Sequence, residues 1–277
     1  MAKDGKLYLS KVGDIKIKLH RPIKGQIKTL TITKEADGWY ACFSVEVTVR
    51  KTAPKLVRSA VGVDVGLESF ATLSDGTQIE NPRWFRKAEK KLALHQRNLS
   101  RKQLKSLNRD KQRDKVAKLH KKTANQRKDF QHKVSRQLVE GNDLIAYEDL
   151  NVRGMVKNRH LAKSISDAGW RQFIAFVCYK AEEAGSMAVA VNPFSTSIDC
   201  SGCGFPVEKT LAQRIHKCPN CGLEIPRDWN AALNIRKLGL LSLPQELRDV
   251  KPVETGTSAP CSKLWSGKQE ATDFNRW

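Results

Sequence analysis

The sequence predicts an α/β protein with a basic helical hairpin and an inserted four-cysteine module, preceded by part of a small β-barrel. Three observations predict this class. Short apolar strands alternate with stretches of helical periodicity, positive charge is concentrated in one helical stretch, and two Cys-x-x-Cys pairs stand fourteen residues apart. With 277 residues, 40% of them hydrophobic, the chain can bury a sizeable core. The longest apolar run, residues 173–179, is far shorter than the roughly 20 residues of a membrane-spanning helix, which excludes an integral membrane protein.

The first fifty residues have the pattern of strands. Alternating runs at residues 14–19 and 43–49, with an Ala36-Asp37-Gly38 turn between them, predict part of a small barrel. Because the first strand begins almost at the first residue, we expect this barrel to be incomplete. Cys42, and Cys178 further on, stand among apolar neighbours and are interpreted as core residues.

Two later runs have the composition of buried strands, and each carries an acid. Residues 59–66 hold Asp64 between two valines, and residues 142–148 end in Glu148. The other elements that the patterns predict are a hairpin over residues 70–80, a helix over 166–184, a strand over 187–191 and a last helix over 228–238.

Residues 86–136 hold 19 Lys and Arg against 4 Asp and Glu, so this stretch carries +15 of the net charge of +21. Its apolar positions keep a helical spacing, which predicts an antiparallel helical hairpin that turns near Asn108. A solvated helix pair is the plainer interpretation, but too few acids are present to pair with the bases. We therefore favour a hairpin that contacts phosphates, with nucleic acid as the partner and an anionic membrane surface much less favoured. The side chains expected to bind nucleic acid are Lys102, Lys105, Arg109, Lys115, Lys118, Lys121, Lys122 and Arg127.

The four cysteines of the module are Cys200, Cys203, Cys218 and Cys221. Two such pairs can form two tight knuckles that hold a structural zinc ion between four thiolates. The glycine that follows each pair suits a knuckle turn with a positive φ. Two disulfides are the alternative, but a lysine-rich chain without a signal peptide indicates a reducing cytoplasm.

Three acids could form a second metal site. Asp64 and Glu148 would lie together if their strands are neighbours in one sheet, and Asp228 opens the last predicted helix. That arrangement is typical of an RNase H-type nuclease, in which carboxylates hold two Mg²⁺ ions about 3.5–4 Å apart. Each acid alone has a simpler interpretation, such as a pairing residue or a helix cap. Gly62 and Gly66 beside Asp64 would let a phosphate backbone approach the strand.

These motifs together resemble a known family. Val61-Gly-Val-Asp-Val-Gly66, Tyr147-Glu-Asp-Leu150 and the cysteine pairs leading into Arg227-Asp-Trp-Asn-Ala-Ala232 are similar to the RuvC nuclease and zinc-ribbon half of the TnpB family, the OrfB-type insertion-sequence transposases related to type V CRISPR nucleases. The resemblance implies that Asp64, Glu148 and Asp228 are catalytic and bind Mg²⁺, and that the four cysteines bind zinc. It also implies a prokaryotic, nucleoid-associated protein in DNA transposition that cleaves DNA with a guide RNA.

Two departures from the family pattern stand out. Pro226 occupies a position where the family commonly has an acid, and the first barrel strand and an inserted helical domain precede the corresponding start in full-length members. We therefore expect an N-terminally truncated chain. The expected segments are a partial, wedge-like barrel at 1–55, a RuvC or RNase H-like domain at 56–193 with the hairpin at 84–140, a zinc ribbon at 194–225, a final helix at 226–238 and a flexible tail at 239–277.

The functional prediction is a transposon-associated, Mg²⁺-dependent DNA endonuclease. The alternative is a non-catalytic nucleic-acid-binding fragment that modulates a full-length parent protein. A zinc-ribbon RNA-binding or ribosomal factor would explain the charge and the cysteines but would leave Asp64 and Glu148 without a role.

Overall fold

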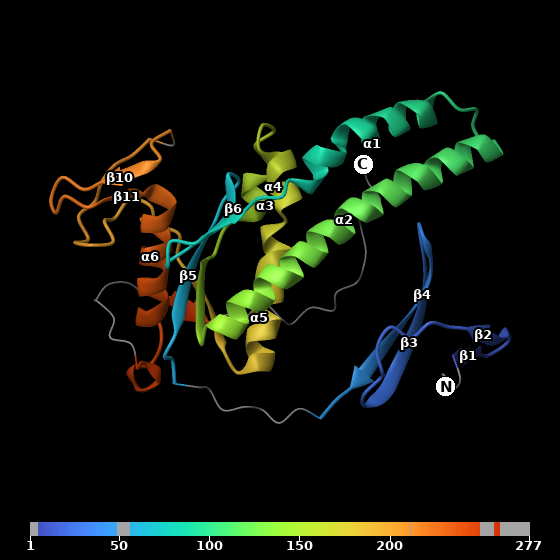
Figure 1. Cartoon of the computed structure of the whole chain (residues 1–277), viewed down its shortest axis with the longest axis horizontal. Coiled ribbons are helices and arrows are strands. Elements are labelled where there is room, and N and C mark those ends of the chain that lie inside the picture. The colour runs from blue at the N-terminus through green and yellow to red at the C-terminus, as the bar shows by residue number, and fades with distance from the viewer. Residues whose placement is uncertain (1–4, 49–55, 211, 250–257, 261–277) are drawn as a thin grey trace. The chain divides into compact units, whose positions relative to one another are not determined.

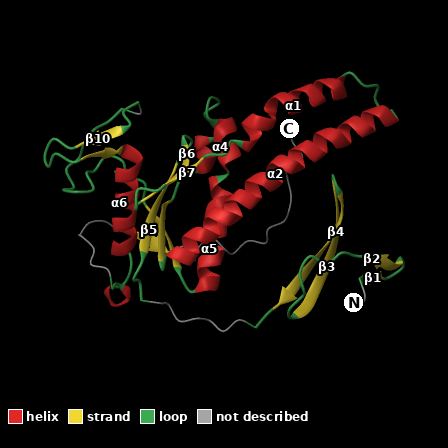
Figure 2. Cartoon of the chain, viewed as in Figure 1, coloured by secondary structure: helices red, strands yellow, loops and turns green. Residues whose placement is uncertain are grey.

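The structure is a computed structural model that describes residues 5–48, 56–210, 212–249 and 258–260 (Figure 1). The chain divides into two compact units, Met1–Lys51 and Thr52–Trp277. The smaller unit consists of strands, whereas the larger unit combines a sheet with helices (Figure 2). An α/β fold, as expected, is therefore present in the larger unit.

The N-terminal unit contains two antiparallel strand pairs. The first joins β1 (Lys6–Leu9) to β2 (Gly13–Lys16), and the second joins β3 (Gln26–Glu35) to β4 (Gly38–Glu46). Each pair is a separate two-stranded sheet, so the described strands of this unit do not form a barrel. Residues 43–46 of the predicted strand form the end of β4, residues 47–48 are not in a strand, and residue 49 lies outside the described residues.

The expectation that Cys42 is a core residue is wrong, because its side chain is exposed. Side chains alternate between the two faces of a strand. In β4 the more buried positions are Ala41, Phe43 and Val45, so Cys42 takes the opposite face. Cys178 is half-buried, with its Sγ atom 3.4 Å from the Tyr147 hydroxyl.

The larger unit is built on a six-stranded mixed sheet with the order β12-β9-β8-β5-β6-β7. β5 lies parallel to β8 and β8 lies parallel to β9, while the remaining neighbours are antiparallel. The predicted buried strands are confirmed as β5 and β8, which are direct neighbours. The strands are β5 (Ala60–Val65), β6 (Ser69–Leu73), β7 (Gln78–Glu80), β8 (Leu144–Glu148), β9 (Met187–Val191) and β12 (Ser258–Pro260).

Strand alternation gives the two faces of this sheet different partners. Val61 and Val63 of β5 belong to the main core together with Phe173 and Val177 of the helix α5 (Trp170–Ala184). Gly62, between the two valines, meets the backbone of α6 (Arg227–Leu241) on the other face. Helices therefore cover the sheet on both sides, with α5 and α6 on opposite faces (Figure 1).

The helix α6 lies unusually close to the sheet because small residues meet there. A Cβ atom on Gly62 would stand 2.1 Å from the Ala232 carbonyl oxygen and 2.5 Å from the Arg236 amide nitrogen. A Cβ atom on Gly239 would stand 2.4 Å from the Cβ of Ala146 in β8. Such separations leave no room for a side chain, so these glycines set the depth of α6 on the sheet.

The basic hairpin consists of α1 (Trp84–Ser100) and α2 (Leu107–Gly141). Its turn comes before the predicted position near Asn108, because the Ser106 side chain accepts a hydrogen bond from the Arg109 amide and starts α2 there. At 35 residues, α2 is about 52 Å long. Its C-terminal half carries most of its buried side chains and packs on α5, and its N-terminal half packs against α1.

The helix expected over residues 166–184 is two helices, α4 (Ala162–Ala168) and α5. Gly169, with φ of 64°, ends the first and starts the second, because its left-handed conformation breaks the helical path. The short helix α3 (Val152–Met155) precedes them.

Ordered structure continues beyond the predicted end of the last helix, which corrects the expected tail for part of its length. The helix α6 reaches Leu241, a 3₁₀ turn follows at Gln245–Leu247, and β12 pairs with β9. The Arg248 side chain donates hydrogen bonds to the carbonyls of Leu241 and Leu243, which fixes the segment behind α6. The remaining tail residues, 250–257 and 261–277, lie outside the described residues.

None of the helices in the described ranges combines the length and the apolar character needed to cross a membrane.

We predict that Gly62→Ala destabilises the protein because its methyl group would overlap the α6 backbone. We expect a loss of about 1–3 kcal/mol in the free energy of unfolding, or roughly 2–4 °C in Tm for each kcal/mol, measured by thermal denaturation. Gly141→Ala is the matched control, since a Cβ atom there meets nothing within 4 Å. Equal melting temperatures for the two variants would contradict the close packing of α6.

Candidate active site

Strand alternation and register bring two of the predicted acids to one place. The parallel pairing of β5 with β8 aligns Val63 with Tyr147, and Asp64 and Glu148 are the next residues of the two strands. They point to the same face as Gly62 and Ala146, which is the face that α6 covers. Asp228 lies in the first turn of α6, so the third acid approaches from above the sheet.

Asp64 is buried, and the charges of the other two acids act on it. Burial raises the pKa of Asp64 well above its usual range, and the negative charges of Glu148 and Asp228 raise it further, while Arg227 lowers it. Glu148 and Asp228 are therefore near enough to Asp64 for their charges to act on its carboxylate. An anionic cluster of this kind favours either proton uptake or a bound cation.

Glu148 ends its strand in a half-buried position. Its Oε1 atom accepts a hydrogen bond of 2.5 Å from the hydroxyl of Thr196, which is buried in the loop after β9. Burial raises the pKa of Glu148, and the bond from Thr196 lowers it in part. Thr196 therefore fixes one oxygen of the carboxylate and leaves the other for a ligand.

Asp228 is held by its neighbour in the chain. The Nε and the Nη2 of Arg227 each lie 3.0 Å from Oδ1 of Asp228. Arg227 also reaches the cysteine module, because its amide donates to the Arg214 carbonyl at 2.7 Å. The guanidinium therefore balances part of the negative charge of the acid cluster.

Gly62 does not serve the role that the sequence analysis gave it. The space above this residue is filled by the α6 backbone, so a phosphate cannot approach the strand there. A Cβ atom on Gly66 would stand 3.0 Å from the Ser69 carbonyl oxygen, in the turn to β6.

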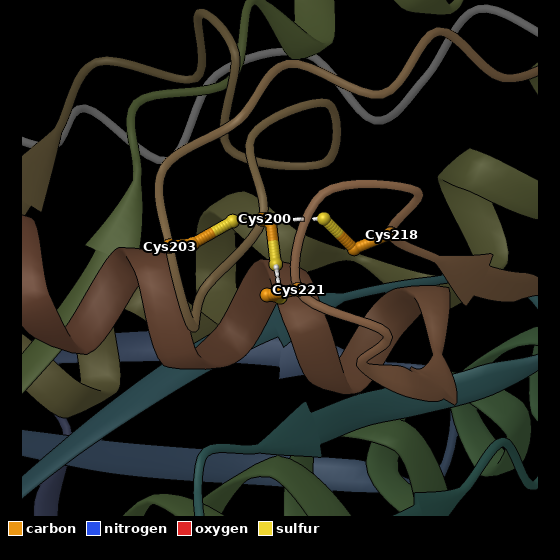
Figure 3. A group of neighbouring side chains, drawn as sticks. All are labelled: Cys200, Cys203, Cys218 and Cys221. Atoms are coloured by element: carbon orange, nitrogen blue, oxygen red, sulfur yellow. Dashed lines mark hydrogen bonds between the residues drawn. The ribbon is translucent and has the colours of Figure 1, made fainter.

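The four cysteines form a tight group of sulfur atoms (Figure 3). All four Sγ atoms lie within 4.8 Å of one another, and the pairs Cys200–Cys221 and Cys203–Cys218 are each 3.6 Å apart. A tetrahedral zinc with Zn–S bonds of about 2.3 Å has S–S edges of about 3.8 Å. The spacing of the four sulfur atoms therefore fits a zinc ion, and the thiolates are the donors that zinc prefers.

The two knuckles repeat the same geometry. Gly204 donates its amide to the Cys200 carbonyl at 2.8 Å, and Gly222 donates to the Cys218 carbonyl at 3.0 Å. Both glycines have a positive φ, 78° and 74°, as the sequence predicts.

The thiols of the cluster have unequal acidities. A hydrogen bond from Asn220 is the main cause that lowers the pKa of Cys203 to about 6. The Leu223 backbone lowers the pKa of Cys221, but the neighbouring sulfurs and burial outweigh it and raise this pKa to about 12. Four adjacent thiols cannot all ionise without a cation between them, which is the role that a zinc ion fills.

The three carboxylates do not form a group as tight as that of the four sulfur atoms. In the part of the chain that the structure describes, the cysteine set is the one group of three or more ligand residues drawn this tightly together.

Two asparagines of α6 connect the cysteine module to the helix that packs on the six-stranded sheet. Asn230 donates to the Asp199 carbonyl at 2.8 Å and accepts from the Ser201 amide at 2.9 Å. Asn234, one turn later, donates to the carbonyls of Thr196 and Asp199. The same helix therefore holds the first knuckle and carries Asp228.

The predicted nucleic-acid-binding side chains differ in their surroundings. Arg109 donates to the carbonyls of Leu99 and Lys102 and closes the hairpin turn, and Arg127 pairs with the buried Asp167 at 3.1 Å. These two arginines therefore hold the hairpin together. The exposed members of the set are Lys102, Lys105, Lys115, Lys118 and Lys122, and Lys121 is half-buried.

Thr196, Arg227, Asn230 and Asn234 were given no role in the sequence analysis. The two asparagines stand four residues apart in the predicted helix, a spacing that places them on one face and could have indicated a shared partner. Thr196 had no comparable signal, because its contact with Glu148 joins residues 48 positions apart.

Comparisons with known proteins identify the family of this chain. A family described as "Probable transposase", OrfB of IS605, matches residues 42–159, and a Cas12f1-like TNB domain matches residues 170–235. A Streptomyces pristinaespiralis protein named "Putative RNA-guided DNA endonuclease" is 37% identical over 244 residues, covering 86% of this chain and 60% of its own length. The Escherichia coli K12 protein named "Putative RNA-guided DNA endonuclease InsQ" is 34% identical, with coverages of 86% and 63%.

A solved structure titled as a Cas12f1–sgRNA–target DNA complex aligns with a TM-score of 0.47 and 18% identity over 75% of this chain and 55% of that one. The chain spans about three fifths of the length of the two curated relatives it matches. Two family matches in the expected order, together with these identities, show that the chain belongs to the TnpB family of OrfB-type transposases, with a Cas12f-like four-cysteine domain.

Proposed function

We propose that this protein is a DNA endonuclease of the TnpB type that hydrolyses phosphodiesters with divalent metal ions at Asp64, Glu148 and Asp228. The observation that carries the proposal is the register of β5 and β8, which places Asp64 and Glu148 directly after the paired residues Val63 and Tyr147, with the charge of Asp228 also acting on Asp64. The names of the relatives support a guide RNA and target DNA as partners.

The donor set fits Mg²⁺, because carboxylate oxygens are its preferred protein ligands. Bound Mg²⁺ ions would supply an activated water and would stabilise the charge on the leaving oxygen. The protein orients Glu148 through the Thr196 hydroxyl and Asp228 through the Arg227 guanidinium. Arg227 also gives the site a positive charge that can attract a phosphate.

The cysteine module has a structural role in this proposal. A zinc ion held by Cys200, Cys203, Cys218 and Cys221 would stiffen the two knuckles. Asn230 and Asn234 connect that rigid module to the helix that carries Asp228. Loss of zinc would therefore loosen one wall of the carboxylate site.

The basic hairpin provides the nucleic-acid contacts in this proposal. Lys115, Lys118 and Lys122 follow one another at intervals of three and four residues and are exposed, so they form a stripe along α2. A stripe of this kind can contact successive phosphates of a backbone without reading bases.

We predict that Asp64→Asn abolishes cleavage, with a loss of roughly a hundredfold or more, because the amide cannot bind the cation. Binding to DNA should remain unchanged. The readouts are cleavage of end-labelled DNA in Mg²⁺ by the protein with its co-purifying RNA, and binding by fluorescence anisotropy. Asp149→Asn, which removes the adjacent exposed carboxylate, is the control. Undiminished cleavage by Asp64→Asn would refute the assignment, and absence of cleavage by the wild type would favour the non-catalytic alternative.

The same variant tests the electrostatics of the site through stability. The folded-state pKa of Asp64 is raised, so its ionised form destabilises the metal-free protein above that pKa. Wild-type stability should therefore fall as pH rises from about 4 through the raised pKa, and Asp64→Asn should flatten this part of the profile and raise Tm at pH 7. Melting curves in EDTA across this range, with Asp149→Asn in parallel, make the comparison. A lower Tm for Asp64→Asn at pH 7 would contradict the repulsion.

We predict one zinc ion per chain, lost in Cys203→Ser together with the folded state of the cysteine module, because three thiolates hold zinc less tightly than four. The metal content is measured by atomic emission and the unfolding by Tm. Cys42→Ser is the control, since that exposed cysteine lies in β4 and should leave the stoichiometry at one. Equal zinc content in Cys203→Ser and the wild type would rule out this ligand set.

Substitution of Lys115, Lys118 and Lys122 by Gln should lower the slope of log binding constant against log salt by up to about 2.7, because each lost phosphate contact removes about 0.9. The triple Lys→Arg variant keeps the charges and should keep the slope. Titrations of duplex DNA at several salt concentrations measure both variants. An unchanged slope in the Gln variant would show that this stripe does not contact phosphates.

A further inference from the structure

Phe194 has the most exposed side chain among the large apolar residues that the structure describes, at 81%. It lies in the loop after β9, the strand that pairs with β8. Single apolar side chains are often exposed on protein surfaces, but this ring lies two residues before Thr196, whose hydroxyl binds Glu148.

The loop around Phe194 is fixed on both sides. The Phe194 amide donates to Oδ1 of Asn192 at 3.0 Å, and the Ser195 carbonyl accepts the amides of Ile198 and Asp199. Ser195 has a φ of 63°, a left-handed conformation that a residue other than glycine adopts only when its surroundings enforce it. The backbone of the loop that carries the ring is therefore held in one conformation.

The same loop supplies the hydroxyl that orients a candidate catalytic acid. Thr196 is buried, donates to Glu148, and has its carbonyl held by Asn234. Two residues of extended chain span at most about 7 Å, so the Cα of Phe194 lies within that distance of the Cα of Thr196. At 3.4 Å per stacked nucleotide, this corresponds to a separation of about two nucleotides.

We propose that Phe194 is a positioning residue on which an unpaired base of single-stranded DNA stacks beside the phosphodiester to be cut. The inference rests on the proposed function, because it places the stacked base relative to Glu148. The chemistry of the surroundings favours this ligand. Lys209 donates to the Ser197 carbonyl of the same loop at 2.7 Å, which brings a positive charge to the loop, and every base offers an aromatic face to a phenyl ring.

A paired duplex would not use this residue, because its bases already stack on one another and their faces are covered. The ring can reach a base face only where the strand is unpaired. Phe194 would therefore select DNA that has been opened near the cut.

Binding measurements test the proposal without any requirement for cleavage. The Asp64→Asn protein and the same protein with Phe194→Ala are titrated with a single-stranded oligonucleotide and with its duplex. We expect Phe194→Ala to weaken binding to the single strand about five- to 150-fold and to leave duplex binding unchanged. Phe194→Trp should restore binding, whereas Phe194→Leu, apolar but not aromatic, should restore it only in part. All variants should keep the parental Tm because the ring is exposed.

An abasic scan locates the contact. Removal of one base from the oligonucleotide should weaken binding of the Phe194 protein at one position and have no effect there on the Phe194→Ala protein. Three outcomes would overturn the inference. The proteins with Phe194 and with Phe194→Ala bind single strands equally well, Phe194→Ala weakens duplex binding as much as single-strand binding, or the protein with Phe194 does not bind single strands at all. A chain that shows the stacking signature but never cleaves would refute only the proposed function, and cleavage that is unaffected by Phe194→Ala would refute only the stacking role.

Discussion

The larger unit depends on the contact between the backbone of α6 and the backbone of β5. Gly62 permits this contact, because any larger residue would occupy the position of the Ala232 carbonyl. With α6 at this depth, its first turn brings Asp228 above the strand ends that carry Asp64 and Glu148. The same helix presents Asn230 and Asn234 to the first knuckle, so one packing contact positions both the acid cluster and the cysteine module.

The acid cluster is held together against its own repulsion. Burial and like charge raise the pKa of Asp64, and Arg227 offsets part of this cost through its bonds to Asp228. A site of this type is stabilised when a cation binds, since the cation removes the repulsion and the carboxylates replace its water ligands. In the proposed function, the cost in stability and the binding of metal ions would have the same physical origin, as is common at functional sites.

The basic hairpin is anchored to the core at one end and exposed to solvent at the other. Near the core, Gln131 donates to the carbonyls of Ala168 and Gly169, and Arg127 pairs with Asp167. Asp167 in turn accepts the amide of Phe85 at the start of α1, so both helices of the hairpin are tied to the junction between α4 and α5. Farther out, the surface of α2 carries lysines such as Lys115 and Lys118 that are exposed to solvent. Arg127 near the junction and Arg109 at the turn therefore stabilise the fold of the hairpin, whereas the lysines farther out on α2 face solvent.

The sequence by itself determined the local features of this protein. Strand alternation, the charge concentration and the Cys-x-x-Cys spacing depend on neighbours in the chain, and they predicted β5, β8, the hairpin and the cysteine cluster correctly. The pattern did not predict the helix boundaries at Gly169 and Ser106. A left-handed glycine or a single N-cap residue moves the end of a helix without changing the hydrophobic period. The tertiary structure alone decided that Gly62 accepts a helix instead of a phosphate, that Thr196 orients Glu148, and that Phe194 stays exposed. The contacts of Gly62 and Thr196 join residues tens to more than a hundred positions apart, and only the packed chain brings such residues together.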